Sequence, residues 1–211
     1  MISTPQPALP DGPVLRASCK AMAVLDALLS PEWIYRYYSY NSAWSPDEEF
    51  FEMRNGEGDQ LLILFRAEGT VINGFSLTAG AADQGELAEV LPPAFHEFMF
   101  GEPVRSAGTT FCLWKYKDEP WKTGPAGLQQ DYSAELLSPL DGNPRTYQEW
   151  ATGYFDGYDR SRGIPLSIVE EIYRGEPLTR EMVESVIPAY DDWEQLAAEL
   201  NEISYPYHIN T

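Results

Sequence analysis

The run QLLILFR at residues 60–66 decides the fold, because its core, LLILF, is apolar without any polar alternation. A strand with one face in solvent would alternate polar and apolar residues. The run is bounded by NGEGD at 55–59 and AEG at 67–69, whose glycines supply the positive φ that tight hairpins require. We therefore expect a central β-strand that is covered on both faces and joined to its neighbours by hairpins.

Other stretches on both sides of this run also have the composition of strands. They are short, rich in aromatic or β-branched residues, and bounded by turn residues. Their short connections predict an antiparallel meander of about five strands, with a further short strand as an option at 134–137. The expected strands are YRYYSY at 35–40, EFFEMRN at 49–55, QLLILFR at 60–66, TVINGFS at 70–76 and TTFCLWKY at 109–116.

Helices are predicted before and after the strand-rich region. Apolar residues recur at helical spacing from Ala17 to Leu29, where Ser30-Pro31 ends the run. After an acidic loop, PPAFHEFMF at 92–100 predicts a short helix that turns Phe95, Phe98 and Met99 inward.

The C-terminal third predicts a run of helices with clear start signals. Asn143-Pro144 and Thr179 are typical helix caps, Ser167 with Glu170 fits a capping box, and a last helix is expected from Asp191 to Ile203. The order of helix, meander and helical run indicates the α+β class. We expect an antiparallel sheet with an N-terminal helix and a C-terminal helical run, its helices on one face or at one end.

The chain is expected to form one domain behind a flexible arm. Four prolines among the first residues predict a disordered, Pro-rich arm over 1–15 and a single α+β domain over 16–211. The segment MISTPQPALPDGP lacks the basic region and apolar run of a signal peptide, and no stretch approaches the roughly 18 apolar residues of a membrane span. Cys19 and Cys112 are expected as buried, reduced thiols, which is typical of a cytoplasmic protein.

The net charge limits the classes of partner. The chain has 33 Asp and Glu against 14 Lys and Arg, a formal charge of -19 at pH 7. Such a charge repels phosphate backbones and anionic lipid, so we expect no nucleic-acid and no membrane binding. The same charge attracts a basic protein partner or a divalent metal, and it also serves solubility alone.

Residues for known catalytic chemistries are sparse. A serine or cysteine nucleophile needs a base, and the two histidines are His96, which lies among phenylalanines, and His208, which is expected in a frayed end. Cys and His lack zinc-ligand spacing, while Glu57 and Asp59 in NGEGD do not match a calcium loop. We predict no catalytic residue, no metal site and no cofactor, although a pair of catalytic carboxylates stays open.

Aromatic residues are concentrated between Trp33 and Trp44, and again between Trp114 and Trp121. Tyr and Trp act either as core residues or as anchors in interfaces, and both faces of a strand at 35–40 belong to the core only if both are covered. The candidate binding residues, on an exposed aromatic and acidic surface, are Tyr38, Tyr40, Trp44, Glu57, Asp59 and Trp121.

Several runs together resemble a known kind of protein: RYYSYNSAW at 36–44, MRNGEGD at 53–59, ILFRAEGTVINGF at 63–75, TTFCLWKY at 109–116 and YQEWATGYFDGY at 147–158. They resemble a group of uncharacterised acidic bacterial proteins, similar in size and acidity to immunity proteins of polymorphic or contact-dependent toxin systems. The likeness spans roughly residues 20–205.

This resemblance implies a protein-binding inhibitor domain that acts on a basic toxin domain, often a nuclease. Association would be steered by charge and would bury aromatic anchors. The alternative is an enzyme or small-ligand-binding protein with a cleft lined by aromatic residues and carboxylates. A third alternative is a structural module without a pocket.

Overall fold

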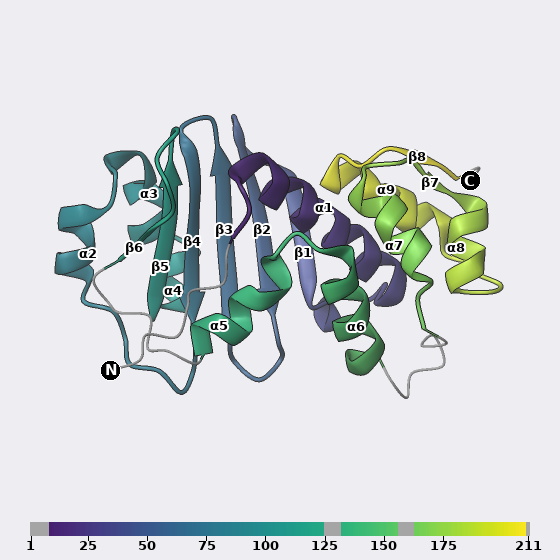
Figure 1. Cartoon of the computed structure of the whole chain (residues 1–211), viewed down its shortest axis with the longest axis horizontal. Helices are drawn as coiled ribbons and strands as arrows, with labels where there is room; N and C mark the ends of the chain where they lie inside the picture. Colours follow the sequence, from purple (N-terminus) through teal and green to yellow (C-terminus); the bar gives the residue numbers. More distant parts are fainter. Residues whose placement is uncertain (1–8, 125–131, 156–162, 210–211) are drawn as a thin grey trace.

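The computed structural model describes residues 9–124, 132–155 and 163–209. A six-stranded sheet spans much of the molecule, and each strand pairs antiparallel with its neighbours in sequence (Figure 1). The predicted α+β class and the meander are confirmed, and a short sixth strand is added at the edge. The strands are β1 (Tyr38–Ser45), β2 (Glu48–Arg54), β3 (Gln60–Arg66), β4 (Gly69–Phe75), β5 (Phe111–Tyr116) and β6 (Lys122–Thr123).

The apolar run in β3 is covered on both faces, as its sequence predicts. Leu61, Ile63 and Phe65 belong to one hydrophobic cluster, while Leu62 and Leu64 belong to a second one. The hairpin glycines on either side, Gly56, Gly58 and Gly69, adopt positive φ. At Gly69 a β-carbon would lie 2.0 Å from the carbonyl oxygen of Lys115 in β5, so only glycine fits this turn.

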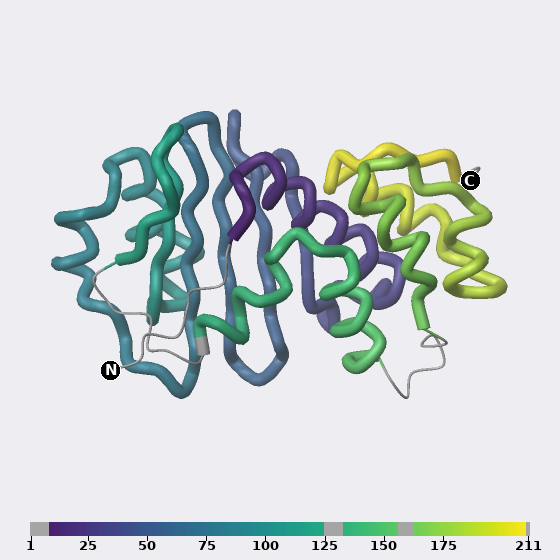
Figure 2. The backbone as a smooth tube through the Cα atoms, in the orientation of Figure 1, coloured from purple at the N-terminus to yellow at the C-terminus, as the bar shows by residue number. Residues whose placement is uncertain are grey.

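The larger cluster is built around α1 (Gly12–Leu29), which is buried on nearly every side. α1 lies against β1 and also contacts α7 and α9, so it forms a layer between the sheet and the C-terminal helices (Figures 1 and 2). A helix in this position needs apolar residues on most sides, and every residue from Ala21 to Leu29 is buried. The other helices of this cluster are α5 (Tyr132–Leu137), α6 (Pro144–Tyr154), α7 (Leu166–Tyr173), α8 (Arg180–Val186) and α9 (Trp193–Ile203).

Short helices cover the opposite face of β3, β4 and β5, which corrects the expectation of helices on one face or at one end. Phe95, Phe98 and Met99 are buried there, as predicted. The segment expected as an acidic loop instead contains a helix, whose N-cap Asp83 accepts a hydrogen bond from the Glu86 N–H. The helical elements of this side are α2 (Gln84–Val90), η2 (Pro93–Phe95), α3 (His96–Phe100) and α4 (Val104–Ala107).

The N-terminal boundary differs from its prediction. α1 begins at Gly12, not at Ala17, so the predicted disordered arm 1–15 overlaps its first turn; residues 1–8 lie outside the described part. Leu15 is fully buried, and the Trp121 indole N–H donates to the Pro10 carbonyl at 3.0 Å. Tertiary contacts therefore order a Pro-rich segment whose composition alone favours disorder.

The predictions for the C-terminal third are confirmed at two helix caps and wrong at several other positions. Asn143 and Thr179 cap α6 and α8 through their side chains, as predicted. Ser167 is no cap, because α7 begins at Leu166 after Pro165. The optional strand at 134–137 is helical and belongs to α5, and His208 is not frayed but pairs in a short parallel ladder between β7 (Leu178–Thr179) and β8 (Tyr207–His208).

The start of β1 also differs, because residues Trp33–Tyr35 form a turn of 3₁₀ helix, η1, and β1 begins only at Tyr38. The buried carboxylate of Asp26 in α1 sets this start. Its Oδ2 accepts the backbone N–H groups of Tyr37 at 3.0 Å and Tyr38 at 2.9 Å, and its Oδ1 accepts the Tyr147 hydroxyl of α6 at 2.8 Å. One side chain thus ties α1 to β1 and α6.

Replacing Asp26 with alanine is expected to lower the free energy of unfolding by about 3 kcal/mol, because three buried donors lose their acceptor. Asp26→Asn keeps one side-chain oxygen that accepts the two N–H groups, so its free energy of unfolding should fall by clearly less. Urea unfolding at pH 8 measures both variants. Equal losses would show that the hydrogen bonds contribute little.

The pH dependence of the unfolding free energy should also reveal the protonation of Asp26. Burial raises the pKa of Asp26 from 3.8 to about 7, against the effect of its hydrogen-bond donors and of Arg36. The folded state therefore holds a proton that the unfolded state releases, so the stability contributed by Asp26 falls as pH rises from about 4 to about 7 and is level above that range. The unfolding free energy of the wild type minus that of Asp26→Asn should show this fall; a flat or rising difference would contradict it.

Candidate functional site

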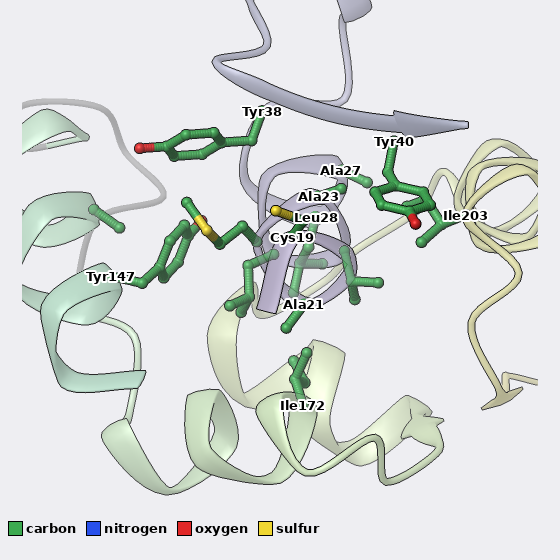
Figure 3. Packing of buried hydrophobic residues seen from close by; sticks show 14 of the residues in the cluster. Cys19, Ala21, Ala23, Ala27, Leu28, Tyr38, Tyr40, Tyr147, Ile172 and Ile203 are labelled. Atoms are coloured by element: carbon green, nitrogen blue, oxygen red, sulfur yellow. The ribbon is translucent and has the colours of Figure 1, made fainter. Parts of the chain in front are cut away.

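Two of the six sequence-predicted binding residues are buried. Tyr38 and Tyr40 both point from β1 into the cluster around α1, and Figure 3 shows Tyr40 directed toward Ile203 of α9. The Tyr40 hydroxyl donates to Glu49 at 2.6 Å. These two tyrosines are therefore core residues, which corrects their assignment to an exposed surface.

The side chains of Asn55 and Asp59 stabilise the β2–β3 turn, and Glu57 takes part through its backbone N–H. The side-chain oxygen of Asn55 accepts the N–H groups of Glu57 and Asp59, and Asp59 in turn accepts the Asn55 amide and the Leu77 N–H. Within the described ranges, no group of three His, Cys, Asp or Glu residues could hold a metal ion. Turn chemistry therefore accounts for the Asp59 carboxylate.

The six predicted residues do not form one surface. Trp44 is exposed near the end of β1, where it stacks on Phe50 at 4.4 Å between ring centroids. The hairpin carrying Glu57 and Asp59 lies at the opposite end of β2. Trp121 directly precedes β6, the strand at the other edge of the sheet; it is half-buried against the cluster around α1 and donates to the Pro10 carbonyl.

The largest group of exposed apolar side chains lies on η1. Trp33, Ile34 and Tyr35 are 54%, 72% and 68% exposed, and we call these three residues the η1 surface. The aromatic run at 35–40 predicts a strand that begins at Tyr35, so this surface is not among the predicted sites. A usable signal was present: three consecutive large apolar residues after Pro31 cannot all point inward from an extended chain.

The η1 surface is exposed because the chain around it is held from inside by a buried arginine. Arg36 donates to the carbonyls of Ser30 at 3.2 Å and Pro31 at 3.0 Å, and its Nη1 pairs with Glu199 of α9 at 2.6 Å. Arg36 is itself only 4% exposed. With the backbone polar groups satisfied inward, the side chains between Pro31 and Arg36 project outward.

A hollow of about 600 Å³ lies on one side of η1, and we call it the first hollow. Ile34 and Tyr35 form part of its lining, together with Pro31, Arg54 and Tyr154. Arg54 lies over the Trp33 ring at 4.0 Å and forms a longer ion pair, 3.7 Å, with Glu52. The hollow is therefore mostly apolar, and the two arginines in its lining, Arg36 and Arg54, are both engaged within the chain.

A smaller hollow of about 100 Å³ lies on the other side of η1, and we call it the second hollow. Trp33 and Trp44 contribute aromatic walls, while Glu52, Glu199 and Glu202 contribute carboxylates. Burial raises the pKa of Glu52, and burial followed by the charge of Glu199 raises the pKa of Glu202. The carboxylates on this side are thus partly deprived of water.

The histidine and cysteine side chains have structural surroundings. A ring nitrogen of His96 lies 2.9 Å from the Leu91 carbonyl oxygen, in agreement with the structural role predicted for it. Cys19 and Cys112 are free and buried, and burial raises the pKa of both thiols. Neither thiol is disposed to act as a nucleophile, because the reactive species is the thiolate.

Arg36 should be essential for stability. Arg36→Ala removes a buried charge that pairs with Glu199 and two backbone carbonyls, and it should lower the free energy of unfolding by about 3 kcal/mol. Arg105→Ala, which removes an exposed pair with Glu102, is the control and should change stability by less than about 1 kcal/mol. Similar effects of both variants in urea unfolding would contradict the anchoring role of Arg36.

The chain was also compared with known proteins. No family model, no curated protein and no solved structure matches it. In the described part of the chain, no helix combines the length and the apolar character needed to cross a membrane. Functional inference therefore depends on the η1 surface and its two hollows.

Proposed function

We propose that this chain is a protein-binding domain that inhibits a basic partner, in the manner of the immunity proteins that its sequence resembles. The observation that carries the proposal is the η1 surface, where three consecutive large apolar side chains are each more than half exposed. Exposed apolar groups gathered in one place mark binding surfaces more often than exposed residues scattered singly.

The residue types and rigidity of this surface suit an interface. Tyr and Trp are enriched among the residues that contribute most to protein–protein affinity, because they bury a large area with few rotatable bonds. The chain on either side is fixed by Arg36 and by the Asp26 hydrogen bonds to Tyr37 and Tyr38. A surface already held in place loses less conformational entropy on binding.

Charge favours a basic partner. The net charge of -19 steers cationic proteins toward the chain over a Debye length or more. Near η1 the two arginines, Arg36 and Arg54, are engaged with Glu199, Glu52 and the Trp33 ring, while Glu32 beside η1 is exposed. The field at the surface is therefore dominated by carboxylates.

A small-molecule ligand is the second candidate, and the first hollow is the observation that favours it. Its volume of about 600 Å³ is within the range of ligand pockets, and its lining is mostly apolar with few polar groups. A thermal-shift screen of small apolar and anionic compounds addresses this candidate directly.

Retention of a basic partner should depend on the η1 surface. Immobilised wild-type protein is exposed to lysate of its source cells at low salt and at about ten times that salt, and retained proteins are identified by mass spectrometry. We expect a basic protein to be retained at low salt and less at high salt. A double variant, Ile34→Ser with Tyr35→Ser, should lose it.

The matched control is Val90→Ser, which removes an exposed apolar side chain from α2, at the end of the molecule beyond the sheet edge opposite to β1 (Figure 1). This variant should retain the partner as the wild type does. Retention by the Ile34 and Tyr35 double variant at wild-type level, or no specific retention at either salt, would overturn the proposal. A thermal shift by a small compound would then favour the ligand-binding alternative.

A further inference from the structure

We propose that the second hollow binds the guanidinium group of one arginine side chain presented by the basic partner. This inference rests on the proposed function and adds the chemical group that is recognised. The hollow lies where η1, β1, β2 and α9 meet, so residues far apart in the sequence supply its walls. Trp33 comes from η1, Trp44 from β1, Glu52 from β2 and Glu202 from α9.

The two tryptophans offer ring surface for a cation. Trp33 carries the Arg54 guanidinium at 4.0 Å from its ring centroid, and Trp44 stacks on Phe50. Each ring thus has one neighbour from the chain itself, and yet the two residues remain 54% and 43% exposed. Tryptophan is the aromatic side chain that attracts cations most strongly.

Strand register and helical spacing place carboxylates of β2 and α9 in the lining of the hollow. In the β1–β2 ladder Ser39 is opposite Glu52 and Asn41 is opposite Phe50, and all four residues line the hollow. Glu199 and Glu202 are three residues apart in α9, so they lie on the same side of that helix. Three carboxylates therefore border one small space.

The cations of the chain do not balance this charge. Arg36 also lines the hollow, but its Nη1 bonds to Glu199 and its other nitrogens bond to backbone carbonyls. Glu52 has only the 3.7 Å contact with Arg54, and no basic side chain of the described ranges pairs with Glu202. A surplus of negative charge is left in the hollow.

The surroundings of two of these carboxylates, the half-buried Glu52 and the exposed Glu202, favour a nearby cation. The pKa of Glu52 is raised by burial, and that of Glu202 is raised by burial and by the neighbouring charge of Glu199. A cation in the hollow adds to the opposite charge that Arg54 supplies at Glu52 and Arg36 supplies at Glu202.

Size and geometry select a guanidinium among the cations. A space of about 100 Å³ suits one side-chain head and is below the volume of typical ligand pockets. The three glutamates are not placed as metal ligands, since no three potential ligands cluster in the described part of the chain. A planar guanidinium both stacks on tryptophan and donates to carboxylates, and this chain already stacks Arg54 on Trp33 and Arg180 on Trp193.

The test uses the full chain and a peptide probe. An acetylated, amidated pentapeptide Gly-Gly-Arg-Gly-Gly is titrated into isotopically labelled protein, and the tryptophan indole N–H resonances are followed by NMR. Substitutions Trp33→Phe and Trp44→Phe assign the two resonances. We expect saturable shifts of both, and no saturable shift with the same peptide carrying neutral citrulline in place of arginine.

Variants distinguish an effect of the second hollow on peptide affinity from an effect of the net charge. The pair Glu52→Gln and Glu202→Gln should weaken peptide affinity about tenfold, whereas the charge-matched pair Glu86→Gln and Glu89→Gln on α2 should change it less than about twofold. Trp44→Ala, at an exposed position, should weaken binding without changing charge. Circular dichroism and thermal unfolding confirm that each variant is folded.

Equal binding of the citrulline peptide, or equal weakening by the two glutamine pairs, would overturn the arginine site. That failure is distinguishable from failure of the proposed function, because Ile34 and Tyr35 do not line the second hollow. If partner retention still depends on those two residues, only the arginine site is wrong.

Discussion

The Asp26 carboxylate fixes how three distant parts of the chain meet. It lies inside α1, and it accepts hydrogen bonds from the first residues of β1 and from Tyr147 in α6. A buried carboxylate is costly unless it is well satisfied, so the folded state favours the arrangement that brings these donors to it. The sheet, the central helix and the C-terminal helices are thereby held in one relative position.

The exposure of η1 is a consequence of this constraint together with a second one. Asp26 holds the backbone at Tyr37 and Tyr38, while Arg36 holds the carbonyls of Ser30 and Pro31 and pairs with Glu199. The short segment between these contacts forms the 3₁₀ turn η1, whose side chains Trp33, Ile34 and Tyr35 point to solvent. Two buried polar groups thus stabilise an apolar surface outside the core.

Local chemistry predicted most of the sheet and several helix ends, because these depend on neighbouring residues. The hairpins at NGEGD and AEG and the caps Asn143 and Thr179 are examples. Features decided by tertiary contacts could not be predicted in this way. Residues 134–137 are helical, Tyr35 lies outside β1, and α1 begins early because Leu15 is buried against the rest of the fold.

The candidate site shows the same division. Alternation correctly places Tyr38 and Tyr40 on one face of β1, but it does not say which face is buried, and packing of α1 and α9 decides this.

The charge has two separable roles at the site. Carboxylates in solvent act at long range and are screened by salt, whereas a partly buried carboxylate such as Glu52 is screened much less. Steering and recognition can therefore use the same kind of side chain, and the environment of each carboxylate determines which of the two it performs.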